Sequence, residues 1–205
     1  MTAVHRHAGP SAASLWVSRF AALVPPGEVL DLACGSGRHA RLFAARGHAV
    51  LAVDRDATAL TQLAAHGDAG LTTLQFDLEV SPVPHATAAA DGVAATVWPF
   101  AAARFAAIVV TNYLHRPLLP SMMTSLAPGG VLIYETFARG NERFGKPSNP
   151  DFLLMSGELL ASAIAGGLTV VAFEQGVIAL PAPAAVQRIC AVRSTGDISL
   201  LQLPG

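Results

Sequence analysis

Two glycines and an aspartate are spaced along the N-terminal third of the sequence in a way that suits ligand binding. Gly35 and Gly37 follow an apolar run at 29–33, and Asp54 ends the next apolar run at 49–54. Glycines let the backbone turn sharply and approach a ligand closely. The start of the following helix favours an anionic group, and an acid at a strand tip can accept hydrogen bonds from a ribose diol. Together these features predict a pocket for a nucleoside cofactor.

Two classes of cofactor are compatible with this spacing. The pattern Gly35-x-Gly37-x-x-Ala40, with Asp54 downstream, also satisfies the loose dinucleotide fingerprint. Asp31 separates the two interpretations, because it lies inside the first predicted strand, four residues before Gly35. A carboxylate there would repel a pyrophosphate, whereas it can make a charge-assisted hydrogen bond, directly or through water, to the ammonium of a methionine moiety. Asp31 therefore favours a nucleoside that carries an amino acid.

Several motifs resemble those of the class I S-adenosylmethionine-dependent methyltransferases and occur in the order of that family. The first motif is similar to DLACGSGRH at 31–39, and the acid of the second strand matches Asp54. The third motif, whose acid and following backbone amide hold the adenine, is similar to LQFDLE at 74–79. The fourth-strand motif and the turn into the fifth strand are similar to 105–113 and 126–133. The Gly-Arg-His run after the glycines resembles the small tellurite-resistance-type methyltransferases.

This resemblance implies S-adenosylmethionine as cofactor and a set of residues that bind it. All of them lie in one of these motifs or directly after it. They are Asp31, Ala33, Gly35, Gly37, Arg38, Asp54, Arg55, Asp77, Leu78 and Asn112. Arg38 is expected near the cofactor carboxylate, with surface solvation as the open alternative for Arg38 and for His39. The histidines do not have the spacing of metal ligands, so no metal site is expected.

Polar and aromatic residues after the fourth and fifth predicted strands are candidates for contacting a methyl acceptor. Open α/β sheets bind ligands at the carboxyl ends of their strands. The loop at 134–150 leaves the fifth strand on that side and is the candidate substrate lid. The expected acceptor contacts are Tyr113, Asn141 and Phe144, and the candidate general bases are Glu135 and His115. A structural role for these residues and for the loop is an equally open alternative.

The motifs must be held by an α/β fold, and the sequence predicts a doubly wound, mostly parallel, seven-stranded sheet of Rossmann-like type. Strands are predicted near 28–33, 49–53, 71–76, 105–111 and 130–136, with helices near 15–20, 37–46 and 56–66, after Pro117 and near 156–165. Their alternation is typical of a parallel sheet. The last apolar runs, 168–178 and 185–193, are joined by a connection too short for a crossover helix. We therefore expect them to form an antiparallel hairpin.

Composition and charge limit which partners, domain organisation and cellular compartment we expect for the protein. The 205 residues carry 13 basic and 14 acidic side chains, a net charge of −1, which favours a small-molecule acceptor over nucleic acid or a membrane. No uninterrupted apolar stretch of about 18 residues is present. Residues 1–12 are expected to form a flexible tail and 13–205 a single domain. Two cysteines, each expected to be buried and unpaired, suit the cytoplasm. No oligomeric state is predicted.

Two alternative functions share the predicted pocket. A catalytically silent S-adenosylmethionine-binding protein, acting as a sensor or an assembly partner, would need the same cofactor residues and no base. A nicotinamide-dependent oxidoreductase would share the glycine turn. Asp31, the position of Asp77 and the C-terminal hairpin all speak against the second alternative.

Overall fold

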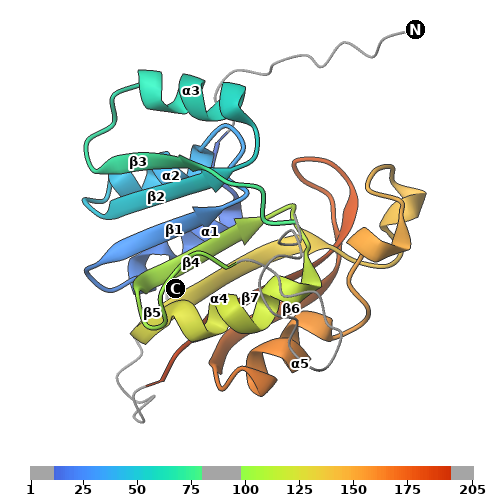
Figure 1. The fold of residues 1–205 in the computed structure, drawn as a ribbon. Coiled ribbons are helices and arrows are strands. Elements are labelled where there is room, and N and C mark those ends of the chain that lie inside the picture. The colour runs from blue at the N-terminus through green and yellow to red at the C-terminus, as the bar shows by residue number, and fades with distance from the viewer. Residues whose placement is uncertain (1–11, 80–97, 195–205) are drawn as a thin grey trace, which may run out of the picture.

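Alternating apolar segments form one central sheet. The computed structural model describes residues 12–79 and 98–194. The strands are β1 (Glu28–Leu32), β2 (Ala49–Asp54), β3 (Leu71–Gln75), β4 (Phe105–Thr111), β5 (Leu126–Phe137), β6 (Thr169–Ile178) and β7 (Ala184–Val192). Their order across the sheet is β3-β2-β1-β4-β5-β7-β6 (Figure 1). Strands β1 to β5 run parallel and β7 is antiparallel to both of its neighbours, which confirms the predicted mixed sheet.

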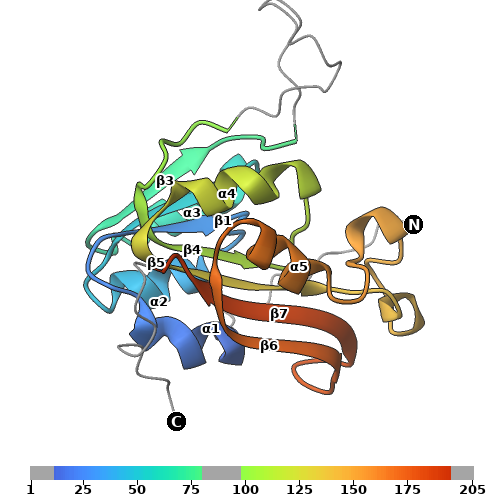
Figure 2. The same ribbon diagram turned by 90° about the horizontal axis from the view of Figure 1, so that it is seen from below.

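Helices cover both faces of this sheet. They are α1 (Leu15–Phe20), α2 (Arg38–Ala44), α3 (Ala57–Ala65), α4 (Leu119–Ser125) and α5 (Glu158–Ala165), with short 3-10 turns η1 (Ala21–Leu23), η2 (Arg116–Leu118), η3 (Asn141–Arg143) and η4 (Pro150–Phe152). Figure 2 shows α1 and α2 on one face and α4 and α5 on the other. Each predicted helix is confirmed with bounds that differ by at most two residues, and α4 begins two residues after Pro117.

Each face of the sheet has its own apolar core. On β1, Leu30 and Leu32 belong to the core beneath α4 and α5, whereas Val29 belongs to the core shared with α1 and α2. Because successive side chains of a strand point to opposite faces, Asp31 points to the face that α2 covers. The apolar alternation of β1 therefore brings this acid to the start of α2.

Strand β5 begins earlier than the sequence indicates. It starts at Leu126, which pairs with Phe105, and after a bulge the pairing resumes with Val131 opposite Ala107. The predicted start near 130 missed this first pair, because the Pro-Gly-Gly run at 128–130 is typical of a turn. The bulge lies at the amino end of β5, so it leaves the carboxyl end of the strand in regular register.

Some predictions fall outside the part of the chain that the structure describes. Almost all of the tail predicted at 1–12 lies there. The division into a tail and one domain stays a prediction. In the described ranges, no helix is long and apolar enough to cross a membrane. Cys34 and Cys190 are both buried and unpaired, as predicted.

Candidate functional site

A pocket of about 200 Å³ lies where four neighbouring strands end. Ala33 follows β1, Asp54 ends β2, Phe76 follows β3 and Tyr113 comes shortly after β4. The lining residues are Ala33, Asp54, Arg55, Phe76, Asp77, Leu78, Glu79 and Tyr113, which we call the carboxyl-edge pocket. Five of the predicted cofactor residues therefore share one pocket with one predicted acceptor residue.

The two glycines after β1 are required for different reasons. Both have left-handed backbones, with φ of 52° at Gly35 and 73° at Gly37. A Cβ at Gly35 would meet no atom within 4 Å, so its surroundings are open. A Cβ at Gly37 would lie 2.4 Å from Leu63 Cδ1, so this glycine allows α3 to pack closely. Gly35 is thus the glycine whose surroundings leave room for a ligand.

Asp31 is buried behind the glycine turn, and its carboxylate uses only part of its hydrogen-bonding capacity there. It is 1% exposed, and its Oδ2 accepts a hydrogen bond from Ala40 N–H at 2.8 Å, near the start of α2. No other residue in the described ranges donates to this carboxylate. Burial raises the pKa of Asp31 to about 7, against the lowering effects of the Ala40 hydrogen bond and of the Arg38 charge. A cationic ligand group beside it would stabilise the ionised form.

Asp54 links the ends of β1 and β2. Its Oδ2 accepts a hydrogen bond from Gly35 N–H at 2.7 Å, and its Oδ1 accepts one from Asp56 N–H at 2.9 Å. Asp56 is the N-cap of α3, because its side chain accepts hydrogen bonds from Thr58 N–H and Ala59 N–H. Each carboxylate oxygen has two lone pairs, so Asp54 can still accept hydrogen bonds from a diol.

Tyr113 reaches the carboxyl-edge pocket from β4. Asn112 before it has a left-handed backbone with φ of 57°, and its N–H donates to Glu135 O at 2.9 Å. The carbonyl of Tyr113 accepts a hydrogen bond from Tyr134 Oη at 2.8 Å. The Tyr113 hydroxyl oxygen is buried and makes no hydrogen bond of regular geometry with the described residues. Burial, followed by the charges of Glu79 and Asp77, raises the pKa of this phenol, and a weak side-chain hydrogen bond to Glu79 adds to the rise, so the phenol keeps its proton.

The two residues after Gly37 have different environments. Arg38 is half-buried, and its guanidinium makes no ion pair within the described ranges, which leaves it free to meet a carboxylate. His39 is 1% exposed, so the surface-solvation alternative is wrong for this residue. Its Nε2 accepts a hydrogen bond from Ser14 N–H at 3.2 Å, and its Nδ1 lies 3.4 Å from Thr111 Oγ1. Burial lowers the pKa of His39 to about 3, so the ring is neutral.

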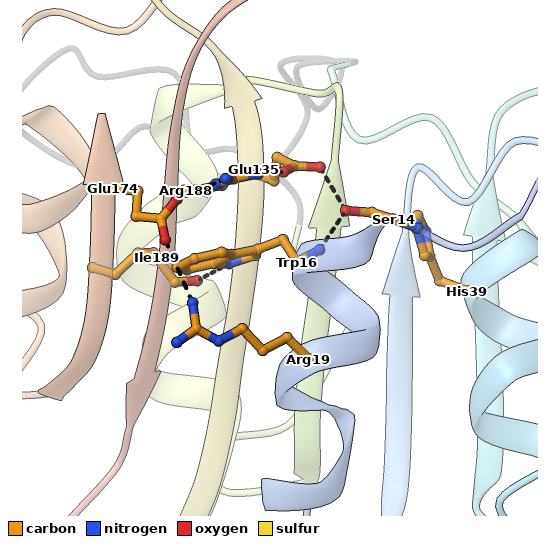
Figure 3. Close-up of polar contacts among 8 residues, drawn as sticks. All are labelled: Ser14, Trp16, Arg19, His39, Glu135, Glu174, Arg188 and Ile189. Carbon is orange, nitrogen blue, oxygen red and sulfur yellow. Dashed lines mark hydrogen bonds and ion pairs between the residues drawn. The ribbon is translucent and has the colours of Figure 1, made fainter. Parts of the chain in front are cut away.

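Glu135, a predicted general base, lies among contacts that join α1 to the last strands of the sheet (Figure 3). Its Oε1 accepts a hydrogen bond from Ser14 Oγ at 2.8 Å, and its Oε2 lies 3.2 Å from Arg188 Nη1. Arg188 also pairs with Glu174 at 2.6 Å and lies over the Trp16 ring at 5.0 Å. We call these five residues, together with Arg19, the α1 network. Both oxygens of Glu135 therefore have partners within the chain.

Neither predicted general base lines the carboxyl-edge pocket. The carbonyl of His115 accepts a hydrogen bond from Leu118 N–H at 3.1 Å, where η2 begins. Its imidazole makes no hydrogen bond within the part of the chain that the structure describes. A catalytic role for Glu135 or His115 stays a prediction. The described ranges contain no group of three His, Cys, Asp or Glu side chains that could hold a metal ion.

The candidate lid projects from the carboxyl edge of the sheet beyond β5 (Figure 1). Asn141 is buried in this loop. Its Nδ2 donates a hydrogen bond to Pro147 O at 3.0 Å, and its Oδ1 accepts one from Ala185 N–H at 3.2 Å. Phe144 is 44% exposed. Arg116, after β4, donates hydrogen bonds to Asp151 O at 2.6 Å and to Leu153 O at 2.9 Å, directly after the end of this loop. The loop is thus held at both ends, with Phe144 on its outer surface.

Several residues around the site were not identified by the sequence reasoning. They are Ser14, Leu63, Phe76, Glu79 and Arg188. Phe76 and Glu79 lie within the third motif at 74–79, so the motif indicated where they lie but gave neither residue a role. Ser14 and Arg188 lie outside every motif, and no local pattern in the sequence distinguishes them.

Comparison with known proteins gives one match to a family model and many structural matches. The family model, described as a methyltransferase domain, matches residues 5–161. No curated protein matches the sequence. The structure is similar to an S-adenosylmethionine-dependent methyltransferase from Mesorhizobium loti, with a TM-score of 0.65 at 18% identity over 90% of this chain and 100% of that one.

Two further solved structures have the same fold. TehB from Haemophilus influenzae aligns with a TM-score of 0.64 at 17% identity, over 86% of this chain and 61% of TehB. A geranyl diphosphate C-methyltransferase from Streptomyces coelicolor A3(2), solved with Mg²⁺, geranyl diphosphate and S-adenosyl-L-homocysteine, aligns with a TM-score of 0.61 at 15% identity. This alignment covers 87% of the present chain and 76% of the other. At these identities the likeness concerns the fold.

Proposed function

The chain belongs to the methyltransferase domain family, and we propose that it transfers a methyl group from S-adenosylmethionine to a small-molecule acceptor by in-line displacement. The observation that carries the proposal is the carboxyl-edge pocket. It joins the acid that ends β2, the acid and backbone amide that follow β3, and the residues after β1 and β4. These are the positions at which a parallel sheet binds a nucleoside.

The residues present fit an adenosine that carries an amino acid. Asp54 has free lone pairs for ribose hydroxyls. The surroundings of Gly35 are open, and Ala33 and Tyr113 complete the lining of the pocket. The proposed contacts, from the amino-acid end to the adenine, are Asp31, Arg38, Asp54, Asp77 and Leu78, with Ala33, Gly35, Gly37, Arg55 and Asn112 around them.

In this mechanism the protein contributes binding, orientation and the exclusion of water. When bound, S-adenosylmethionine supplies a methyl group that its sulfonium already activates. Asp31 and Arg38 hold the amino-acid end and Asp54 holds the ribose, so that the chain fixes the donor at the end of β4. Positioning of this kind accounts for about 7–11 kcal/mol of barrier in favourable model reactions, whereas a general base adds only about 10²–10⁴ in rate.

A small-molecule acceptor is supported by charge and by the fold. The net charge is −1, which offers no field for a polyanion. One structural neighbour was solved with geranyl diphosphate, a small molecule. Tyr113, Asn141 and Phe144 remain proposed contacts on the acceptor side, and Glu135 and His115 remain proposed bases for an acceptor that must lose a proton. A cytoplasmic location is part of the same proposal.

Calorimetry and a transfer assay test this function. Purified protein should bind both S-adenosylmethionine and S-adenosylhomocysteine, and it should be stabilised against heat by each ligand. It should then transfer a labelled methyl group to a member of a panel of small hydroxyl, amine, thiol and carbon acceptors. Absence of heat and of thermal stabilisation with both ligands would overturn the cofactor assignment. Binding without transfer to any acceptor would instead support the silent-binder alternative.

A further inference from the structure

Strand β6 forms one edge of the sheet, beyond β7 (Figure 2). It has ten residues, and within the described ranges it pairs with β7 alone. Outside this ladder, no backbone group of β6 makes a hydrogen bond to any residue that the structure describes. The opposite edge, β3, has only five residues. Because unpaired N–H and C=O groups on an edge strand are a template for another strand, β6 is the longer of the two templates.

The features that usually prevent contact between sheet edges are weak on β6. Such features are lysine, proline, uncompensated charge and bulges. The strand contains neither lysine nor proline and carries one charge, at Glu174. The Glu174 carboxylate accepts a hydrogen bond from Arg188 at 2.6 Å and pairs with Arg19 at 3.5 Å, so the chain itself compensates this charge. A bulge interrupts the ladder at 170–172, but the register is regular over 172–178.

Apolar side chains are exposed along this edge. Six of the ten residues of β6 are apolar, yet none of the ten is buried. Val177 is 65% exposed, and Leu15 and Leu180 are 79% and 75% exposed. Leu15, Ile178 and Leu180 line one groove of about 340 Å³ between α1 and the end of β6. Because neighbouring side chains of a strand point to opposite faces, Val177 and Ile178 place apolar surface on both faces of the edge. Exposed apolar surface of this extent marks an interaction site.

A second copy of the same edge matches β6 in hydrogen bonding, in polarity and in charge. A two-fold axis perpendicular to the sheet places two β6 strands antiparallel, and such a contact uses the same surface of both subunits. The exposed rim carries one cation, Arg19, and one anion, Glu174, with 48% and 45% exposure. Each copy therefore offers the opposite charge to the other. The net charge of −1 gives little repulsion between two copies.

We propose that two copies of the chain associate through β6, with an antiparallel pairing over residues 172–178 that makes one continuous sheet across both subunits. The exposed side chains of Leu15, Val177 and Leu180 pack in this interface. The inference goes beyond the proposed methyl transfer and does not depend on it, because the carboxyl-edge pocket lies at the ends of strands in the other half of the sheet.

Sedimentation velocity measures the association. The parent protein should pass from the mass of one chain to the mass of two as its concentration rises. Val177→Lys should raise the dissociation constant of the dimer at least about ten-fold, because the two-fold axis brings two like charges together. Ile164→Lys is the matched control, since Ile164 is 61% exposed but lies on α5, and this variant should associate like the parent. If circular dichroism shows that Val177→Lys does not fold, Leu180→Lys tests the same surface.

Hydrogen exchange locates the interface. Amides of 172–178 should exchange more slowly at concentrations where the dimer forms, whereas those of β3, at the other edge, should not change. The mass of one chain at every concentration would overturn the inference, and so would equal weakening of the dimer by the Val177 and Ile164 variants. A dimer without slower exchange in β6 would place the interface elsewhere and overturn it. Slow exchange of 172–178 in the monomer would show that another segment of the chain covers the edge, which also overturns it.

Discussion

The carboxyl-edge pocket and the α1 network lie at the same edge of the sheet, but their polar groups are satisfied to different degrees. In the pocket, Arg55 and Glu79 approach each other only to 3.9 Å, and their side chains are 69% and 38% exposed. In the α1 network, both oxygens of Glu135 and all three guanidinium nitrogens of Arg188 have partners within the chain. Polar groups with unused hydrogen-bonding capacity favour a ligand, whereas matched groups stabilise the fold. This contrast separates residues that can bind a ligand from residues that stabilise the fold at the same edge of the sheet.

The α1 network has a structural task because α1 cannot persist alone. The helix has six residues, and helices shorter than about 12–15 residues are marginal in water. Its Trp16, Val17 and Phe20 are buried against the sheet, and Trp16 Nε1 donates to Ile189 O at 3.2 Å. The network therefore acts with this apolar contact to hold α1 on the sheet. Changes in the network should alter stability more than ligand binding.

Arg188→Ala should have the largest effect on stability. It leaves the buried Glu135 without its guanidinium partner and removes the cation from the face of Trp16. Breaking a fully buried pair costs about 3–5 kcal/mol. Because the Arg188 and Glu135 side chains are 22% and 12% exposed, we expect a loss of about 2–3 kcal/mol in the free energy of unfolding, measured in urea. Affinity of the folded variant for S-adenosylhomocysteine should stay within about two-fold, and a ten-fold loss would contradict the division between the two regions.

Asp54→Ala should act mainly on ligand binding, although it also removes the acceptor for Gly35 N–H and Asp56 N–H and so lowers stability. It removes the hydrogen bonds proposed for the ribose, and hydrogen bonds to a charged group contribute about 1.5–3 kcal/mol. We expect the dissociation constant of S-adenosylhomocysteine, measured by calorimetry, to rise about 10- to 100-fold. Asp56→Ala is the control, since it removes the N-cap of α3. This control should lower stability by about 1 kcal/mol without changing affinity. Equal affinity losses in both variants would show that the effect of Asp54 is structural.

Asp31 should make cofactor binding depend on pH. Burial raises its pKa to about 7 in the free protein, so the carboxyl is largely protonated at pH 6 and ionised at pH 8. A cationic ammonium beside it favours the ionised form, and binding below pH 7 must therefore release a proton. We expect affinity to rise about ten-fold from pH 6 to pH 8. Asp31→Asn, measured in parallel, should lack this rise while retaining any titration of the ligand amine. If the affinities of the parent protein and of Asp31→Asn changed with pH in the same way, the role of Asp31 would be contradicted.

The same shift predicts the direction of a change in stability without ligand. The folded state holds the proton of Asp31 at pH values where an unfolded aspartate, with a pKa of 3.8, has lost it. The contribution of this group to stability is therefore largest below pH 4 and is lost as the pH rises towards 7. Unfolding in urea at pH 5 and pH 7 should show this loss in the parent protein and not in Asp31→Asn.

The sequence predicted the parts of the structure that local patterns determine. The strand-helix alternation followed from apolar runs, and the C-terminal hairpin followed from the short connection before residue 185. Five of the ten predicted cofactor residues line one pocket, because the motifs mark strand ends and parallel strands end at one edge.

Features set by long-range register could not be predicted in this way. Arg188 lies directly across from Glu135 on β5 and from Glu174 on β6, which requires knowing that β7 is inserted between these strands. The close packing of Leu63 on Gly37 depends on the docking of α3. The direction of Tyr113 depends on the left-handed backbone of Asn112, a conformation that a non-glycine residue rarely adopts. These residues are therefore placed by tertiary contacts.

Arg19→Ala should have the smallest effect and tests whether burial decides the strength of the α1 network. Arg19 pairs with Glu174 at 3.5 Å, and the two side chains are 48% and 45% exposed. Exposed pairs contribute about 0–1 kcal/mol, so we expect a loss of roughly 0.5 kcal/mol or less in urea unfolding. Arg188 pairs with the same Glu174 at 2.6 Å but also holds the buried Glu135. If the two arginine variants lost equal stability, Glu174 and not Glu135 would be the centre of the network, and the buried pair would not be the anchor of α1.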